Sequence, residues 1–295
     1  FTSVAEDAAT DLVAAAFEAG ISYFDTAPQY GHGLSEQRLG RALAGLDRDS
    51  FTVATKVGRL VVANPDAVGT EWFPDAPPSD AVFAFDRDSI LRSIDKSLER
   101  LGLDRLDVVQ IHDPDDVADQ AIEESYPVLH ELRDQGVIRA IGVGMNQSAV
   151  PTRFITETDI DAVLLAGRYT LLDQSATADL IPAARAAGVS VLIGGVFNSG
   201  ILADPDNSPR YDYLPASPEV IARAHRIRDV CRRHHVDLIQ AALAFVMRER
   251  AVTSVLLGAR SRSELEQSLA IDVDTVPDEL WRELSEEGLI HELDG

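Results

Sequence analysis

Cysteine and long apolar runs are the first features that the sequence lacks. Its 295 residues include one cysteine, Cys231, which excludes an internal disulfide framework and a cysteine-based zinc site and favours a reducing compartment. No apolar run approaches the about 20 residues that a membrane-spanning helix needs, and no signal peptide is visible. We therefore expect a cytoplasmic protein with no membrane partner.

Basic residues are scarce as well. The chain has 26 lysines and arginines against 49 aspartates and glutamates, for a formal net charge of −23. Nucleic acids and anionic membranes are bound by basic surfaces, so this balance argues against both as partners. We expect a small molecule as the partner instead, and any anionic ligand would need a local positive site.

Lysine is nearly absent, because only Lys56 and Lys96 stand among the 26 basic residues. A lysine that persists against such a bias in favour of arginine is a candidate for chemistry that needs an amine. We interpret the lysine at position 96 as present by chance, without a chemical role. Whether Lys56 has a chemical role depends on the sequence that surrounds it.

Strand-like apolar runs alternate with amphipathic helical stretches along the whole chain, which predicts an α/β fold with buried parallel strands. Seven strands are predicted, near residues 21, 51, 106, 137, 162, 189 and 252. A closed (β/α)8 TIM barrel needs eight, so we expect the first strand to precede Phe1. The rival, a doubly wound open sheet, usually carries a G-x-G-x-x-G turn, which is missing here.

The chain shows no linker or low-complexity segment, so residues 1–295 are predicted to form a single barrel domain. The longest irregular stretch, residues 58–86, contains four prolines and four aromatic residues, and we interpret it as a long substrate loop. Residues 277–295 are predicted to form a C-terminal helix and tail.

Reactive residues of such barrels stand at the carboxyl ends of the strands. Asp25, Lys56 and His112 each follow a predicted strand directly, and Tyr30 lies five residues beyond Asp25. A neighbouring ammonium lowers the pKa of a tyrosine, which is otherwise near 10. A carboxylate can hold that ammonium in place, while a histidine can bond the substrate oxygen. Together the four side chains form a candidate acid/base set.

The segment after His112 is also acidic, with Asp113, Asp115 and Asp116. Such a cluster can ligate a metal, but we interpret it as a solvated loop and predict no metal site.

Several motifs carry a specific resemblance that spans essentially the whole chain. The sequence resembles the aldo-keto reductase family in residues 24–36 (FDTAPQYGHGLSE), 54–58 (ATKVG), 97–112 (SLERLGLDRLDVVQIH) and 136–143 (GVIRAIGV). Residues 111–115 (IHDPD) and 197–202 (FNSGIL) are similar to the aldose 1-dehydrogenase branch of that family, which also includes pyridoxal 4-dehydrogenase.

The resemblance implies a (β/α)8 barrel that binds NAD or NADP in extended form. It implies Tyr30 as the general acid/base, Lys56 and Asp25 as the groups that tune it, and His112 as the residue that orients the substrate.

Cofactor residues follow from the same resemblance. It implies a nicotinamide contact, a pyrophosphate loop and an adenosine segment, formed respectively by Asn146, by Gly195, Phe197, Ser199 and Gly200, and by Gly258, Arg260, Ser261, Glu264, Gln267 and Ser268. A carboxylate at Glu264 would repel a 2′-phosphate and accept from a ribose hydroxyl. Arg260 can still pair with the phosphate. We therefore favour NAD, or use of both cofactors.

The expected activity is oxidation of an aldose at C1 to the lactone, with Arg59 and Trp72 as substrate contacts. Alternatives within the class are pyridoxal 4-dehydrogenase and a general aldehyde reductase. A non-catalytic, cofactor-binding regulatory subunit and an unrelated barrel enzyme such as an isomerase remain further alternatives.

Overall fold

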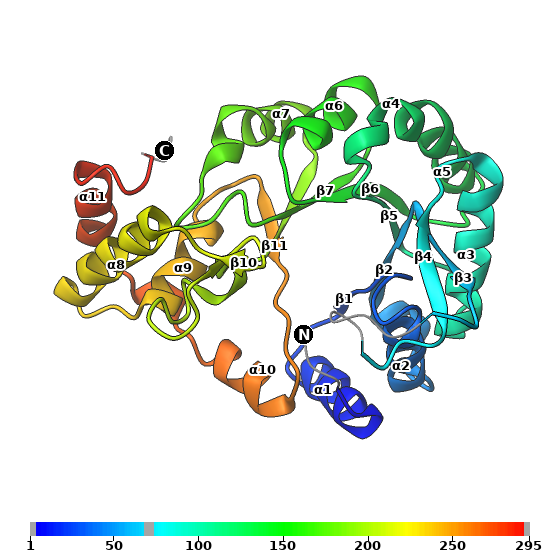
Figure 1. Cartoon of the computed structure of the whole chain (residues 1–295), viewed down its shortest axis with the longest axis horizontal. Coiled ribbons are helices and arrows are strands. Elements are labelled where there is room, and N and C mark those ends of the chain that lie inside the picture. Colours follow the sequence, from blue (N-terminus) through cyan, green and yellow to red (C-terminus); the bar gives the residue numbers. More distant parts are fainter. Residues whose placement is uncertain (1–3, 68–73, 292–295) are drawn as a thin grey trace. The chain divides into compact units, whose positions relative to one another are not determined.

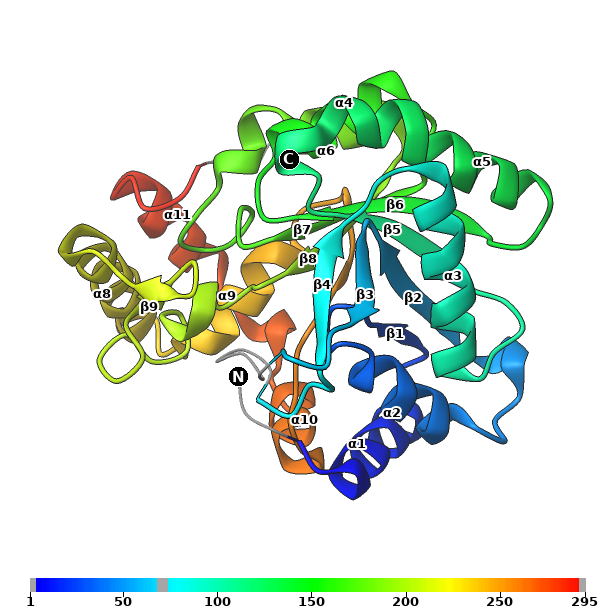
Figure 2. The same cartoon turned by 45° about the vertical axis from the view of Figure 1, so that its right-hand side comes forward.

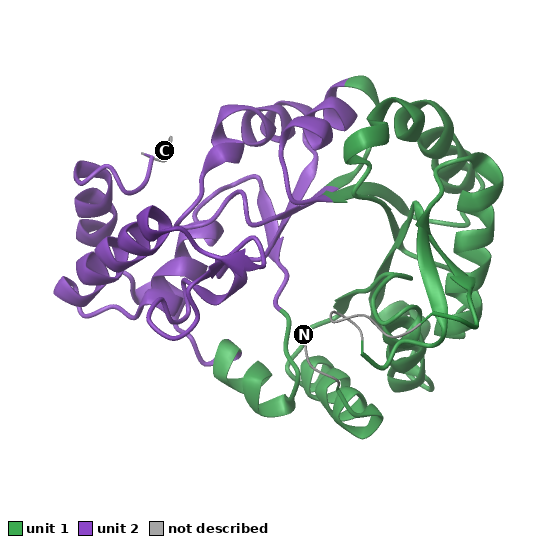
Figure 3. Ribbon diagram, viewed as in Figure 1, with its two compact units in different colours: residues 1–144, 157–162, 258–268 green, residues 145–156, 163–257, 269–295 purple. Residues whose placement is uncertain are grey.

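The computed structural model describes residues 4–67 and 74–291. They form two compact units, which Figure 3 distinguishes by colour. Unit 1 comprises residues 1–144, 157–162 and 258–268, and unit 2 comprises residues 145–156, 163–257 and 269–295. Each unit is described by itself.

Unit 1 is built on four parallel strands that lie in the order β1-β2-β5-β6. They are β1 (Tyr23–Asp25), β2 (Thr52–Val57), β5 (Val108–His112) and β6 (Ala140–Met145). Lys56 pairs with Gln110 across β2 and β5, and His112 pairs with Gly144 across β5 and β6. This parallel register brings the carboxyl ends of the strands to one edge, where the predicted catalytic residues stand.

The helices of unit 1 cover the outer side of this sheet, as α2, α3 and α5 do in Figures 1 and 2. The elements are α1 (Glu6–Glu18), α2 (Leu34–Leu43), α3 (Arg87–Leu101), α4 (Ala118–Gln120), a π turn (Ala121–Ser125), α5 (Tyr126–Asp134) and α10 (Arg262–Leu269), with 3-10 turns at Arg48–Ser50 and Asp115–Val117.

Helix α3 shows how the sequence sets these boundaries. Asp86 caps its first turn, because the Asp86 side chain accepts a hydrogen bond from the Ser89 N–H. Ile90, Ile94 and Leu101 lie on its buried face, and the left-handed Gly102 ends it.

A hairpin within residues 58–86 corrects the prediction of an irregular stretch. Strands β3 (Arg59–Ala63) and β4 (Ser79–Phe83) pair antiparallel over five residues each. The backbone enters β3 through Gly58 at φ +96°, where a Cβ would meet the ring of Phe85. The proposed role of this segment as a substrate loop remains a prediction.

Unit 2 repeats the same alternation of strand and helix. Its parallel strands are β7 (Ala162–Ala166), β8 (Ser190–Gly194) and β11 (Val252–Val255), in the order β7-β8-β11. Its other elements are α6 (Ala149–Glu157), α7 (Leu180–Ala187), α8 (Pro218–Arg233), α9 (Leu238–Met247) and α11 (Asp278–Glu286), the short hairpin of β9 (Arg210–Tyr211) and β10 (Leu214–Pro215), and 3-10 turns at Ser175–Ala178, Asn198–Gly200 and Val273–Thr275.

The predicted α/β class and its βα repeat are confirmed. The strands predicted near residues 21, 51, 106, 137, 162, 189 and 252 all form. Most are largely buried, as β2 and β5 are, whereas β1 and β11 are partly exposed. The strand expected before Phe1 lies outside this sequence and remains a prediction. Within residues 4–67 and 74–291, no helix combines the length and the apolar character needed to cross a membrane.

Candidate active site

Lys56 lies at the centre of the site in unit 1. Its ammonium Nζ donates to Asp25 Oδ1 at 2.5 Å and to the carbonyl oxygen of Thr26 at 2.9 Å. Only 1% of the side chain is exposed. A buried ammonium is tolerated when it is paired and hydrogen-bonded in this way.

The charge state of Lys56 follows from these contacts. Burial is the largest effect and by itself lowers the pKa of the ammonium, but the charges of Asp25 and Tyr30 and their hydrogen bonds outweigh it. The pKa of Lys56 is therefore raised from its ordinary value. Lys56 remains a cation at neutral pH and can stabilise negative charge on Tyr30.

Tyr30 lies against both Lys56 and His112. Lys56 Nζ is 4.7 Å from the centroid of the Tyr30 ring. The rings of Tyr30 and His112 meet edge to face, with centroids 5.9 Å apart. The turn that presents Tyr30 is fixed by two backbone hydrogen bonds, from the Tyr30 N–H to Ala27 and from the Ser35 N–H to the Tyr30 carbonyl.

His112 is buried and neutral. Burial, together with the positive charges of Lys56 and Arg59, holds the pKa of His112 well below its ordinary value. Its Nε2 atom lies 3.5 Å from Asp113 Oδ2, and its buried Nδ1 has no hydrogen-bond partner among the described residues. A neutral imidazole in this position can donate one hydrogen bond to a substrate oxygen.

Gln110 belongs to this cluster, although the sequence analysis missed it. Its Nε2 donates to Asp25 Oδ2 at 2.9 Å, so both oxygens of Asp25 are occupied, one by Lys56 and one by Gln110. The available signal was a polar residue in an apolar strand, two positions before His112 and therefore on the same face. Gln110 therefore fixes the Asp25 carboxylate, which in turn binds the Lys56 ammonium.

The predicted substrate contacts have different outcomes. Arg59 lies near His112, and its guanidinium stacks over the Phe83 ring, with Cζ 4.5 Å from the centroid. Its Nη2 donates to Asp113 Oδ2 at 2.8 Å. Trp72 lies outside the described residues, so its role remains a prediction.

The predicted adenosine segment also belongs to unit 1, and several of its side chains form hydrogen bonds with other residues of the same segment. Glu264 accepts from the Arg260 guanidinium, with 2.6 Å between Nη2 and Oε1, and from the Arg260 backbone N–H at 2.8 Å. Ser261 Oγ in turn accepts from the Glu264 N–H, which caps α10. The guanidinium of Arg262 is held by Asp11 and Glu18 of α1. The remaining predicted residues of this segment are Gly258, Gln267, whose Nε2 bonds Ser263, and Ser268, whose Oγ bonds the Glu264 carbonyl.

The predicted nicotinamide and pyrophosphate residues belong to unit 2. Asn146 is exposed just after β6. In the loop after β8, Gly195, Ser199 and Gly200 all have positive φ, and Ser199 Oγ accepts a hydrogen bond from the Tyr213 N–H at 2.9 Å. Phe197 precedes the 3-10 turn of this loop. Their role in cofactor binding remains a prediction.

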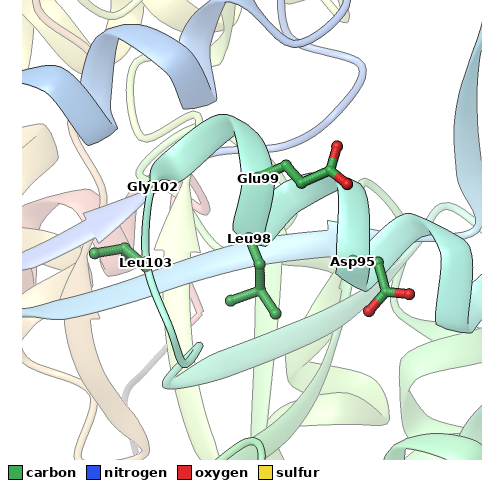
Figure 4. A pocket seen from close by; sticks show the side chains of 5 residues that line it. All are labelled: Asp95, Leu98, Glu99, Gly102 and Leu103. Carbon is green, nitrogen blue, oxygen red and sulfur yellow. The ribbon is translucent and has the colours of Figure 1, made fainter.

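A surface hollow at the end of α3 is separate from these residues. It is lined by Asp95, Leu98, Glu99, Gly102 and Leu103 (Figure 4). Its charged side chains are both carboxylates, so it offers no cationic side chain to an anionic cofactor. Among the described residues, no group of three or more His, Cys, Asp or Glu side chains gathers as in a metal site.

Known proteins resemble this chain along nearly its whole length. The model of the Aldo/keto reductase family matches residues 2–286. The chain is 40% identical to D-threo-aldose 1-dehydrogenase of a Pseudomonas species and 37% identical to pyridoxal 4-dehydrogenase of Microbacterium luteolum, in each case over 98% of this chain and 91% of that protein. The solved holo form of an aldo-keto reductase from Bacillus halodurans is similar with a TM-score of 0.76 and 25% identity, over 96% of this chain and 88% of that one.

Proposed function

This chain belongs to the aldo/keto reductase family, and on that premise we propose that it oxidises an aldose at C1 to the lactone, with Tyr30 as the general acid/base. Membership makes it an NAD(P)-dependent oxidoreductase with the (β/α)8 fold. The identity with an aldose dehydrogenase supports the substrate class.

The observation that carries the proposal is the arrangement of four side chains around a buried ammonium. Lys56 contacts both Asp25 and Tyr30, and the ring of His112 packs edge to face against Tyr30. A purely structural role would leave unexplained why a lysine, rare in this chain, is buried beside a phenol. The arrangement does suit a tyrosine that must lose and regain a proton.

Each group has a part in the chemistry. In the oxidative direction the Tyr30 oxygen removes the proton of the anomeric hydroxyl, and Lys56 stabilises the phenolate that precedes this step. His112, neutral because its pKa is low, donates a hydrogen bond to the same substrate oxygen. Asp25 and Gln110 keep Lys56 in place. A bound nicotinamide cofactor supplies the hydride acceptor.

The contacts of the predicted adenosine segment fit the unphosphorylated form of the nicotinamide nucleotide best. Arg260 is engaged with Glu264 through its side chain and its backbone. A 2′-phosphate would have to break that pair and approach the freed carboxylate, whereas a ribose hydroxyl can donate to Glu264. We therefore favour NAD, with use of both cofactors as the alternative.

Initial rates test the proposal directly. We expect NAD reduction, measured as absorbance of the reduced nicotinamide, with one or more free aldoses in a panel of aldoses, pyridoxal and small aldehydes. Turnover of pyridoxal alone would assign the chain to the alternative, pyridoxal 4-dehydrogenase. Tight binding of NAD without turnover of any substrate would favour the regulatory subunit.

Glu264→Gln tests the basis of cofactor preference. Glutamine can still accept from the Arg260 backbone N–H, and the Ser261 cap uses the backbone of residue 264 and is unaffected. Glutamine carries no charge, however, that would repel a phosphate or hold the Arg260 guanidinium. The ratio of kcat/KM for NADP to that for NAD should rise by about tenfold, as expected for one charge-assisted pair. Glu266→Gln is the matched control, because Glu266 is exposed on the same helix. An equal shift in both variants, or in neither, would contradict the assignment.

A further inference from the structure

Arg59 and Asp113 form an ion pair next to the catalytic histidine. Arg59 Nη2 lies 2.8 Å from Asp113 Oδ2, and the same oxygen is 3.5 Å from His112 Nε2. The two side chains are 20% and 26% exposed, so they are neither fully buried nor free in solvent. The pair is therefore placed to meet the part of a substrate adjacent to its reacting oxygen.

The backbone of Asp113 fixes the direction of its carboxylate. Asp113 has φ +45°, a left-handed conformation that aspartate tolerates better than most residues. Its N–H donates to the carbonyl of Gly144 at 3.1 Å, which ties this residue to the end of β6. A position held in this way is over-determined by its surroundings, a condition frequent at ligand contacts.

Both cations at this edge of unit 1 are paired. Burial raises the pKa of Asp113, and the negative charge of the nearby Asp115 adds to this effect. Lys56 is paired with Asp25, Arg59 is paired with Asp113, and His112 is neutral. The site therefore holds no unpaired cation among these groups that could attract an anionic substrate. The net charge of −23 adds a long-range field that disfavours anions as well.

The pair nevertheless offers strong polar contacts to an uncharged substrate. Guanidinium N–H groups and carboxylate oxygens lie side by side, so they can donate to one hydroxyl and accept from its neighbour. The Phe83 ring stacks on Arg59 and is 63% exposed, which provides an apolar face for C–H groups. This combination matches a polyol whose hydroxyls alternate with C–H bonds.

We propose that the Arg59–Asp113 ion pair is a charge filter that admits uncharged polyhydroxylated substrates and excludes their anionic counterparts, the sugar acids and sugar phosphates. The inference rests on the proposed function, because it concerns the substrate of the same site. It adds Asp113 as a specificity-determining residue and assigns Arg59 to the recognition of uncharged substrates.

Two variants with opposite expected signs test the filter. Asp113→Asn leaves the guanidinium unbalanced, whereas Arg59→Gln leaves the carboxylate unbalanced. The substrates are an aldohexose, its uronic acid and its 6-phosphate, matched in stereochemistry, with NAD. For Asp113→Asn the ratio of kcat/KM for the aldose to that for either anion should fall at least about tenfold, the scale of one hydrogen bond to a charged group. For Arg59→Gln the ratio should rise instead, because the unbalanced carboxylate repels either anion.

Asp116→Asn is the matched control, since Asp116 is an exposed carboxylate of the same segment. An unchanged ratio in Asp113→Asn, or an equal fall in Asp116→Asn, overturns the filter. Calorimetric binding of the uronic acid and of the free aldose to each variant gives a second readout, independent of turnover. If Asp113→Asn binds the uronic acid no more tightly than the unaltered protein does, the filter is overturned even where the rates are too low to measure.

The experiment separates the inference from the proposed function. Absence of turnover with any aldose or aldehyde would defeat the proposed function, while the binding measurements would still decide the filter. Turnover of aldoses with an unmoved ratio would defeat the filter alone.

Discussion

Tyr30→Phe is expected to lower kcat/KM for the aldose by about 10³-fold or more while leaving the binding of NAD nearly unchanged. Loss of a positioned general acid/base typically costs 10²- to 10⁴-fold. The upper part of that range applies because the other groups of the cluster act through the Tyr30 oxygen. Lys56 is buried, so solvent has little access to replace the missing phenol.

Phenylalanine preserves the rest of the arrangement. The ring can keep its packing against Lys56 and its edge-to-face contact with His112, because neither depends on the hydroxyl. The variant should therefore fold normally and bind the nucleotide, as measured by quenching of intrinsic fluorescence. Initial rates then give kcat/KM, and single-turnover stopped-flow measurements report the chemical step.

Tyr126→Phe is the matched control, since it removes the same atom from a tyrosine of α5 whose hydroxyl bonds Asp159. Its activity should remain close to that of the unaltered protein. Retention of more than about a tenth of the activity in Tyr30→Phe would be incompatible with general acid/base catalysis by this residue.

Gly40→Ala should destabilise the fold by about 1 to 3 kcal/mol, the range expected when a packed backbone has no room for an added methyl group. In an exposed helix the same change is stabilising, since alanine is the better helix former. Here a Cβ on Gly40 would lie 2.5 Å from the carbonyl carbon and 2.7 Å from the Cα of Leu101, with the carbonyl oxygen closer still. These are backbone atoms, so α2 and α3 would have to separate.

Urea unfolding measures this effect. The midpoint of Gly40→Ala should fall with little change in slope. Gly258→Ala provides the comparison, because a Cβ there would meet no atom within 4 Å, and its stability should change by no more than about 0.5 kcal/mol. Equal stability of the two variants would show that α2 and α3 can move apart freely.

The gathering of Asp25, Lys56 and His112 in one place could be predicted from the sequence because parallel strands end at one edge. Asp25, Lys56 and His112 each follow an apolar run, and the parallel topology places the residues that end such runs at the same edge of the sheet. Gln110 could not be assigned in the same way. Its importance depends on its hydrogen bond to Asp25, and the linear sequence does not show which side chain of the neighbouring strands Gln110 reaches.

Other features depend on contacts that a linear pattern does not encode. The hairpin of β3 and β4 was missed because its strands are separated by a proline-rich segment that has no helical or strand period. Arg260 and Glu264 were both predicted to contact the cofactor, which remains a prediction, while the ion pair between them was not foreseen although its i,i+4 spacing allows it. Asp113 was interpreted as part of a solvated acidic loop, yet its left-handed backbone directs it to Arg59.

The scarcity of lysine has a practical consequence for handling the protein. Lys56 is enclosed and hydrogen-bonded, whereas the side chain of Lys96 on α3 is 58% exposed. An amine-reactive ester would therefore find a single accessible lysine side chain. The molecule could be tethered to a surface or labelled with a dye through α3 while the buried ammonium of Lys56 remains unmodified.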